Sequence, residues 1–253
     1  MAKEHDFFVI EDCAQAHGSQ WRGRNAGTLG DIGSFSFQQR KVMTSGEGGA
    51  LVTDDRDLLL RLYSLKNCGR KYQETEGEHI QSGNYRITEF QAAILLAQLE
   101  RFESQLLLME ENACLLDESL SAIEGLSPMA QHPQANRRCY YVYLFRYDED
   151  GFGGLPMAKF RDAFSAELDM TLSGVQGGAL NDAPLYQPHT KKRYHWSDEY
   201  WQAIDPSQYE LPVCEGPKNV IGIFHNYLLG GKGDMADIVR AAEKVRKHVA
   251  ALL

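Results

Sequence analysis

Cysteine is scarce in this chain of 253 residues, and the few cysteines follow no pattern. There are five of them, an odd number, and no CxxC pair occurs, so the sequence indicates neither a zinc site nor a disulfide framework. Long apolar runs are also missing: Ala92–Ala97 is among the longest, and it is far too short to span a bilayer. The N-terminus has no apolar signal core followed by a small-residue cleavage site. These absences predict a cytoplasmic protein with reduced thiols and no membrane partner.

Positive charge is in short supply as well. Lysine and arginine number 26 against 35 acidic residues, which gives a net charge of −9 at pH 7. No extended basic block occurs, and we interpret Lys191–Arg193 as a solvated loop face. An acidic chain of this kind argues against nucleic acid as a partner. The hydrophobic share of 43% and the length are sufficient for one or two domains with a buried core.

The first half of the chain alternates strand and helix patterns, which is typical of an α/β sandwich. The apolar run 6–12 predicts a strand buried on both faces, as in a parallel sheet. Aromatic and small residues alternate in 33–39, and 49–55 predicts a strand followed by a helix capped by Asp54 or Asp55. Thr88 is the expected N-cap of a long helix that reaches about Ile123.

Two prolines and a glycine in 124–138 indicate a boundary. We therefore predict a domain over 1–124 that holds the sheet and the long helix, and a smaller α+β domain over 125–253. The patterns expected in the second domain are a β-rich run at 139–147, a helix at 157–168, a strand at 169–175 and an amphipathic helix at 233–253.

Lys41 stands in a short polar crossing, QQRKVMTSGEGG, between two apolar runs. A lysine that reacts with a carbonyl should lie at a strand end, beside backbone that can approach a ligand closely. Gly46, Gly48 and Gly49 permit such an approach, because glycine has no Cβ and tolerates positive φ. The same pattern is also compatible with a surface lysine in an ordinary crossing loop.

Asp12 ends the first predicted strand, where α/β sheets place groups that contact ligands. An acid at this point could cap a helix or pair with Arg22 or Arg24. It could also face a protonated heteroaromatic nitrogen. Pyridoxal 5'-phosphate (PLP) requires a lysine for its imine and an acid for its ring nitrogen, and Asp12 and Lys41 offer this combination.

The stretch 9–55, VIEDCAQAHGSQWRGRNAGTLGDIGSFSFQQRKVMTSGEGGALVTDD, is followed by SGNYRITEFQAAILLAQLE at 82–100. Together they resemble the DegT/StrS family of PLP-dependent sugar aminotransferases, and the resemblance extends from Phe8 through the C-terminal helix. It implies fold type I, with part of the large α/β/α domain and a small C-terminal α+β domain. The glutamine pair before Lys41 and the stretch 184–205 are most similar to the branch that aminates keto-cyclitols of the scyllo-inosose type.

The resemblance implies roles for five residues. Lys41 matches the Schiff-base lysine, and Asp12 matches the acid paired with the pyridine nitrogen. Gln15 matches the side chain near the phenolic oxygen of the cofactor, and Ser36 matches a serine that binds the phosphate. Asn84 matches an asparagine that reaches the phosphate of the neighbouring subunit's cofactor, which implies a homodimer. From the residues alone, Ser36 could equally alternate outward on its strand, and Asn84 could form a turn before the long helix.

The implied reaction transfers an amino group from glutamate or glutamine to a keto-sugar or keto-cyclitol. Related aminohydroxybenzoate synthases share the pattern around Lys41 and are an alternative. Dehydratases of the same fold have a histidine in place of the lysine, so the presence of Lys41 argues against a dehydratase. An inactive remnant that only dimerises is a further alternative. His17 could contact the cofactor ring or the substrate, or it could be a structural histidine.

Family members carry a long segment before the strand that ends at Asp12. That segment holds a phosphate-binding turn at a helix N-terminus and an aromatic residue that stacks on the cofactor ring. Only eleven residues precede Asp12 here, and they contain no such turn. We therefore expect this chain to correspond to the C-terminal part of such an enzyme, with apolar strand faces left exposed.

Overall fold

The computed structural model describes residues 1–72, 80–173, 183, 195–205 and 219–253. The chain divides into two compact units. Unit 1 contains 1–114, 130–141 and 225–231, and unit 2 contains the described residues of 115–129, 142–224 and 232–253. The predicted division into domains 1–124 and 125–253 stays a prediction about the whole protein.

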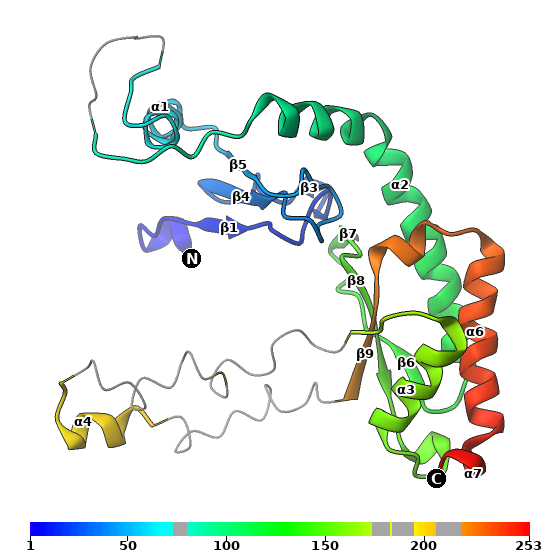
Figure 1. Ribbon diagram of the computed structural model, residues 1–253. Helices are drawn as coiled ribbons and strands as arrows, with labels where there is room; N and C mark the ends of the chain where they lie inside the picture. Colours follow the sequence, from blue (N-terminus) through cyan, green and yellow to red (C-terminus); the bar gives the residue numbers. More distant parts are fainter. Residues whose placement is uncertain (73–79, 174–182, 184–194, 206–218) are drawn as a thin grey trace. The chain divides into compact units, whose positions relative to one another are not determined.

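Unit 1 combines short strands with two helices (Figure 1). Its elements are a 3₁₀ helix at Ala2–Glu4, β1 (Ile10–Asp12), β2 (Gln20–Trp21), β3 (Arg24–Asn25), β4 (Ile32–Ser36), β5 (Gly49–Val52), α1 (Arg56–Lys66), the larger part of α2 (Glu89–Ser121), β7 (Ala135–Arg137) and a 3₁₀ helix at His225–Leu229.

Two small sheets form in unit 1. One has the order β1-β4-β5, in which β1 runs parallel to β4 and β5 runs antiparallel to it. The other has the order β3-β2-β7, with both pairs antiparallel. The parallel β1–β4 pair confirms the expected parallel strand at the start of the chain.

The structure shows that the first strand is shorter and less buried than the sequence predicts. β1 begins at Ile10 rather than at Asp6, and the side chains of Phe8 and Ile10 are 60% and 68% exposed. The physical reason is that β1 is an edge strand, paired with β4 on one side only among the described residues, and its apolar side chains are left uncovered. This exposure agrees with the expectation of uncovered strand faces.

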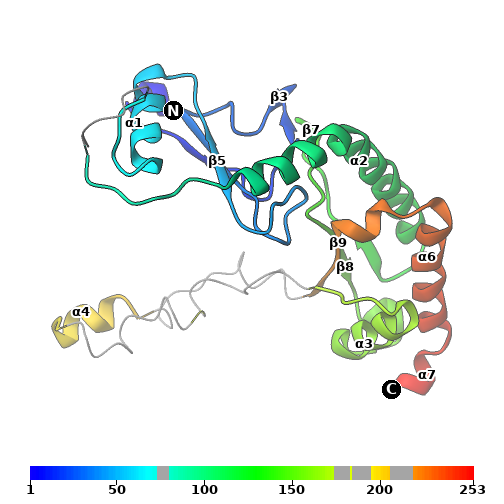
Figure 2. The same ribbon diagram turned by 45° about the horizontal axis from the view of Figure 1, so that its top comes forward.

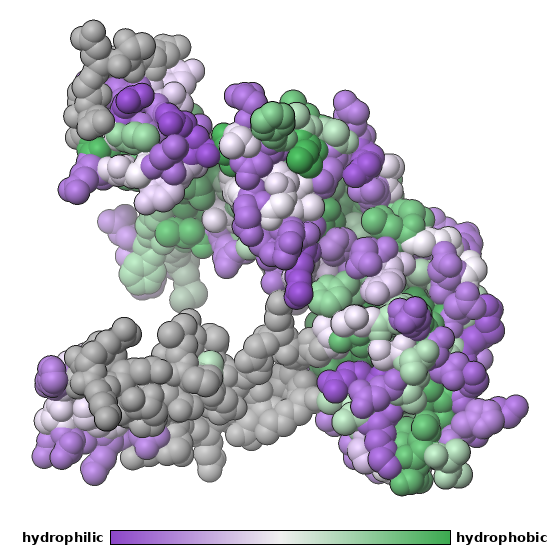
Figure 3. Space-filling model, in the orientation of Figure 1, coloured by the Kyte–Doolittle hydropathy of each residue, from purple (hydrophilic) through white to green (hydrophobic). Residues whose placement is uncertain are grey.

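Hydrophobic side chains also gather elsewhere on the surface of unit 1. Figure 3 shows them over the N-terminal part of α2, where Phe90, Leu96 and Leu99 are more than half exposed. Contiguous apolar surface of this kind marks interaction sites or association between molecules.

The helix starts in unit 1 follow local sequence signals. The Asp55 side chain accepts a hydrogen bond from the backbone N–H of Leu58 and caps α1, as predicted. Thr88 and Gln91 form a capping box at the start of α2: the Thr88 hydroxyl accepts from the Gln91 N–H at 3.3 Å, and the Gln91 side chain accepts from the Thr88 N–H at 2.8 Å. The observed α2 agrees with the predicted long helix.

Unit 2 is built on an antiparallel sheet of order β6-β8-β9. The helices α3 and α6 lie beside this sheet and contact each other (Figures 1 and 2). The elements of unit 2 are the end of α2, β6 (Leu126–Pro128), β8 (Val142–Tyr147), a 3₁₀ helix at Asp150–Phe152, α3 (Met157–Leu168), α4 (Asp198–Ala203), β9 (Val220–Phe224), α6 (Lys232–Lys247) and α7 (Val249–Leu252).

An aromatic core holds unit 2 together. The ring of Phe160 on α3 stacks on Tyr147 of β8 at 4.4 Å between centroids, and it meets the ring of Phe152 edge-on at 4.9 Å. The Phe164 ring packs edge-on against Phe145 at 6.2 Å. These side chains are almost fully buried, and burying each one contributes about 1.5–3 kcal/mol relative to exposure.

The predictions for the second half have mixed outcomes. The helix at 157–168 is confirmed, and the C-terminal helix is present but is interrupted at His248 between α6 and α7. The strand predicted at 169–175 is wrong over its described part, where only Ser173 forms an isolated bridge with Gly222. The rest of that strand, the KKR stretch at 191–193 and the first half of the keto-cyclitol-like stretch 184–205 lie outside the described residues.

Candidate active site

The adjacent parallel strands β1 and β4 bring two predicted site residues to one edge of the sheet. Asp12, the last residue of β1, is in register with Ser34 of β4, and Ser36 ends β4. Both strands therefore finish at the same edge. Ligands of open α/β sheets bind outside the carboxyl ends of the strands, so this edge is the candidate active site.

Lys41 lies in the loop that leaves this edge after Ser36. The loop closes on itself, because the Phe37 N–H donates to the Gly48 carbonyl at 2.8 Å and the Ser45 N–H donates to the Phe37 carbonyl at 3.1 Å. Gly46 and Gly48 have φ of +84° and +143°, which explains why glycine is needed at both positions. Lys41 is half-buried within this loop.

Two glutamines of α2 hold the Lys41 loop in place. The Gln98 side chain accepts from the Thr44 N–H at 3.0 Å and donates to the Thr44 carbonyl at 2.5 Å. The Gln91 side chain donates to the Glu47 carbonyl at 2.8 Å. Sequence reasoning missed both contacts, because nothing local relates a helical glutamine to a loop about fifty residues away.

Three of the predicted site residues hold local turns with their side chains. Asp12 accepts from the Ala14 N–H at 3.0 Å, Ser36 accepts from the Gln38 N–H at 3.3 Å, and Asn84 accepts from the Arg86 N–H at 3.3 Å. Each bond runs two residues forward, the pattern of Asx and Ser/Thr turns. The turn orients each side chain and leaves further acceptor capacity on its oxygen.

The alternative pairing of Asp12 with an arginine is not observed. The Arg22 side chain donates to the Gln134 side chain at 2.9 Å, and the Arg24 side chain donates to the Thr28 carbonyl. Asp12 is exposed at the sheet edge and is open to a ligand.

Gln15 and Asn84 occupy different parts of unit 1. Gln15 is exposed in the connection that follows Asp12, so it shares the edge with Asp12. Asn84 lies after α1, where it forms an antiparallel bridge with Asn67. Among the described residues, no hydrogen bond joins Asn84 to Asp12, Ser36 or Lys41. The role implied for Asn84 concerns a neighbouring subunit.

His17 is buried beneath the loop that carries Lys41. Its side chain is 3% exposed, its ring lies 5.5 Å from the ring of Phe35 and 6.1 Å from that of Phe37, and neither ring nitrogen forms a hydrogen bond. Burial lowers the pKa of His17 from its usual value, against an opposing effect of the Ser36 backbone, and the Lys41 ammonium lowers it further. His17 is therefore uncharged at neutral pH.

Cys139 provides a second uncharged group near Lys41. Burial raises the pKa of the Cys139 thiol to about 12, although the backbone of Tyr141 and His17 and the charge of Lys41 act in the opposite direction. A thiol of this kind is neither a nucleophile nor a metal ligand at neutral pH.

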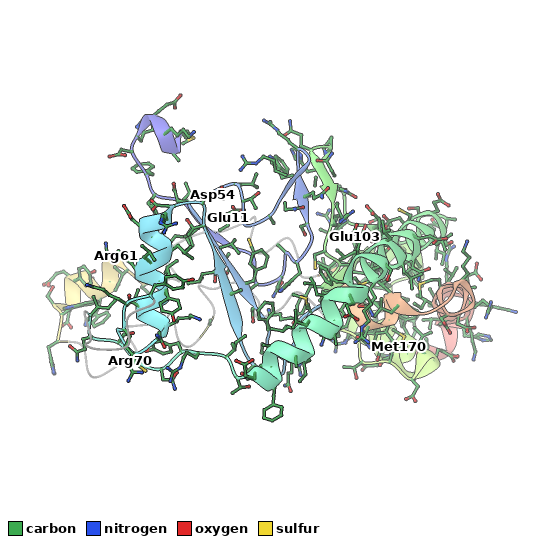
Figure 4. All side chains as sticks on the ribbon, turned by 90° about the horizontal axis from the view of Figure 1, so that it is seen from above. Glu11, Asp54, Arg61, Arg70, Glu103 and Met170 are labelled. Carbon is green, nitrogen blue, oxygen red and sulfur yellow. The ribbon has the colours of Figure 1, made fainter. Side chains whose placement is uncertain are left out.

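Glu11 fixes the backbone that follows β3. Its carboxylate accepts from the N–H groups of Gly27 at 2.9 Å, Leu29 at 2.6 Å and Gly30 at 2.7 Å. Partial burial raises the pKa of Glu11, but these three hydrogen bonds and the charge of Arg24 outweigh it, and the pKa is lowered overall. Figure 4 shows Glu11 beside the strands of unit 1.

The ring of Tyr141 lies against the side chain of Lys41. The Lys41 Nζ lies 4.8 Å from the centroid of the Tyr141 ring, within the range of a cation–π interaction. The sequence pattern predicts only that Tyr141 belongs to a β-rich run, so it does not predict this contact.

A pocket of about 520 Å³ lies elsewhere in unit 1, between the sheet and α1. It is lined mainly by apolar side chains, including Leu51, Leu59, Leu62 and Tyr63, and contains none of the five predicted site residues. This pocket therefore lies on the uncovered face of the sheet and is not the candidate active site.

The residue types at the candidate site fit PLP. A half-buried lysine follows one strand, a carboxylate ends the neighbouring strand in register, and a serine hydroxyl lies at the same edge. Groups of these types can provide a covalent anchor, a partner for the ring nitrogen and a hydrogen bond for the phosphate of PLP. In the described ranges, no group of three or more His, Cys, Asp or Glu side chains is placed to hold a metal ion.

A lysine and a carboxylate at neighbouring strand ends of an α/β sheet are the pair of groups that PLP-dependent enzymes use. Comparison with known proteins identifies the family. Residues 1–196 match the DegT/DnrJ/EryC1/StrS aminotransferase family, and the chain belongs to it.

Named relatives and a solved structure agree with this membership. The L-glutamine:2-deoxy-scyllo-inosose aminotransferase of Streptoalloteichus tenebrarius is 40% identical over 98% of this chain and 61% of its own length. The L-glutamine:scyllo-inosose aminotransferase of Streptomyces griseus is 35% identical over 98% of this chain and 61% of its length. The crystal structure of 3-amino-5-hydroxybenzoic acid synthase matches with a TM-score of 0.74 and 28% identity, covering 96% of this chain and 61% of that one.

These matches confirm the predicted fold class, an α/β chain corresponding to part of a fold-type I transferase. The chain spans about three fifths of the length of the curated relatives it matches. Of the helices in the described residues, none combines the length and the apolar composition needed for a membrane crossing.

Proposed function

We propose that this chain is the lysine-bearing part of a PLP-dependent aminotransferase that aminates a keto-cyclitol of the scyllo-inosose type, with glutamine or glutamate as the donor. The observation that carries the proposal is the in-register pairing of β1 with β4, which leads Asp12, Ser36 and the Lys41 loop to one edge. The names of the relatives support the choice of substrate class.

Each predicted residue has a role in this proposal. Lys41 is the covalent anchor for PLP and, when free, carries a proton to and from the substrate carbon. Asp12 would pair with the ring nitrogen and hold its proton, and PLP, when bound, would supply an electron sink. Gln15 faces the phenolic oxygen, and Ser36 binds the phosphate.

Asn84 contributes to the phosphate site of a neighbouring subunit, so the proposal includes a homodimer. Its place in the connection between α1 and α2, in a bridge with Asn67, is compatible with this role. The cytoplasmic location expected from the composition stays a prediction.

Aminohydroxybenzoate synthesis is the second candidate. It is supported by the match to 3-amino-5-hydroxybenzoic acid synthase. The two candidates differ in their products: an aminocyclitol keeps a saturated ring, whereas an aminohydroxybenzoate is aromatic and absorbs in the ultraviolet. Incubation with each keto substrate and glutamine, followed by mass and absorbance measurement of the product, separates them.

Borohydride reduction of the full-length enzyme in excess PLP, followed by peptide mapping, tests the role of Lys41. We expect the label on Lys41 and its loss in Lys41→Arg. Lys66 is a matched control, because its Nζ also lies over a tyrosine ring, 5.1 Å from the centroid of Tyr63, outside the site. A label on Lys66 or another lysine, or no label at all, would contradict the proposal and favour an inactive remnant.

A further inference from the structure

The Lys41 side chain lies against the ring of Tyr141. The Nζ is 4.8 Å from the ring centroid, and no carboxylate of the described residues forms an ion pair with it. The face of an aromatic ring carries partial negative charge, so it attracts an ammonium group.

The Tyr141 ring is itself held firmly. Its side chain is 6% exposed, and the ring of His225 stacks on it at 6.1 Å between centroids and 22° between planes. The position of the ring, and therefore of the ammonium group on it, is set by packing within unit 1.

Two titratable groups near Lys41, His17 and Cys139, are neutral. His17 and Cys139 face this region from the loop after β1 and from the segment before β8, and both are uncharged at neutral pH because they are buried. Neither of these two groups carries a charge that would compete with the Tyr141 ring for the Lys41 ammonium.

We propose that Tyr141 is a positioning residue for Lys41, whose ring face holds the lysine amine at the site whenever it is not joined to the cofactor. This inference rests on the proposed function, in which Lys41 carries the cofactor for only part of each cycle. A cation–π contact suits this task, because it orients the ammonium and is weaker than a buried ion pair, so the amine can leave it.

Nuclear magnetic resonance of the whole chain tests the proposal without the cofactor. Reductive methylation with ¹³C-formaldehyde converts each lysine to a dimethylammonium that keeps its charge, and Lys41→Arg assigns the Lys41 signal. An aromatic ring shields groups above its face, so we expect the Lys41 signal upfield of the signals of exposed lysines. Tyr141→Phe should keep this shift, and Tyr141→Leu should abolish it.

Two matched controls separate positioning from general packing. Tyr140→Leu removes a neighbouring tyrosine that is 4% exposed and whose ring holds Arg138 at 5.1 Å, and it should leave the Lys41 signal in place. The Lys66 signal, shielded by Tyr63, should be unchanged in all variants.

An unshifted Lys41 signal in the original chain would overturn the proposal. A shift that survives Tyr141→Leu, or one that Tyr140→Leu also abolishes, would overturn it equally. The proposed function fails separately: a borohydride label on another lysine with the ring shift intact refutes the role of Lys41 but leaves the Tyr141 contact standing. A label on Lys41 without the ring shift refutes only the role of Tyr141.

Discussion

Asp12 of β1 is in register with Ser34 of β4 across a parallel strand pair. This relationship places the end of β1 beside the end of β4 and thereby sets Asp12 at the edge from which the Lys41 loop departs. The candidate site thus depends on a pairing between two strands of three and five residues.

Asp12→Asn should reduce amino transfer much more than PLP content. An amide cannot hold the ring nitrogen protonated as a carboxylate does, and removing one electrostatic group of this kind costs roughly 10²–10³ in rate. In the full-length enzyme, bound PLP after gel filtration and the rate of transfer from glutamine are the two measurements. Asp54→Asn, at an exposed aspartate outside the site, is the control (Figure 4). A rate near that of the original protein in Asp12→Asn would refute the assigned role.

Gln98→Leu should loosen the Lys41 loop. The substitution removes both side-chain hydrogen bonds to Thr44 and leaves a partly buried N–H and carbonyl unmatched. We expect a loss of about 1–3 kcal/mol in the free energy of unfolding. Urea denaturation measures it, and Gln98→Glu, which keeps an acceptor for the Thr44 N–H, should lose less. Equal stability of Gln98→Leu and the original chain would show that the two hydrogen bonds between Gln98 and Thr44 do not stabilise the fold.

Glu11→Gln should remove a contribution to the free energy of unfolding that exists at neutral pH and is lost at acidic pH. The folded state lowers the pKa of Glu11, so its contribution is fully present above the ordinary value of 4.5 and disappears as the pH falls through the lowered folded value. The stability difference between the two proteins should therefore be largest near pH 7, roughly 1 kcal/mol, and should shrink below pH 4.5. Urea titrations at several pH values measure it, with Glu100→Gln on the exposed surface of α2 as the control. A constant difference across this range would contradict the assignment.

The isolated chain should self-associate and should bind PLP weakly. Ile10, Phe90 and Leu96 are 68%, 85% and 66% exposed, and apolar surface of this extent favours contact between molecules. Sedimentation velocity should show a mass that rises with concentration. Phe90→Ser should reduce this rise more than Leu253→Ser, which changes an exposed leucine at the C-terminus. A monodisperse monomer that binds PLP tightly and stoichiometrically would refute both expectations.

Helices were the features most accurately predicted from sequence. The bounds of α3, the Asp55 cap and the Thr88 capping box all follow from residues within one or two turns of each other. A helix satisfies its hydrogen bonds within itself, so local sequence carries most of the information.

Strands were predicted less well. The run 6–12 has the composition of a buried strand, yet only Ile10–Asp12 pairs with β4, and 169–173 forms a single bridge despite its strand-like pattern. A strand needs a partner to satisfy its backbone groups, and the partner is selected by the fold rather than by the strand's own sequence.

The sequence by itself determined the family, the fold class, and the candidate residues Asp12, Gln15, Ser36, Lys41 and Asn84, because motif spacing along the chain carries that information. Only the tertiary structure decided that Gln98 holds the loop at Thr44, 54 residues away, and that the ring of Tyr141 lies against Lys41, 141 − 41 = 100 residues away. Contacts at such separations depend on how α2 and the segment before β8 pack around the sheet edge. Local propensity and motif spacing do not predict how those segments pack.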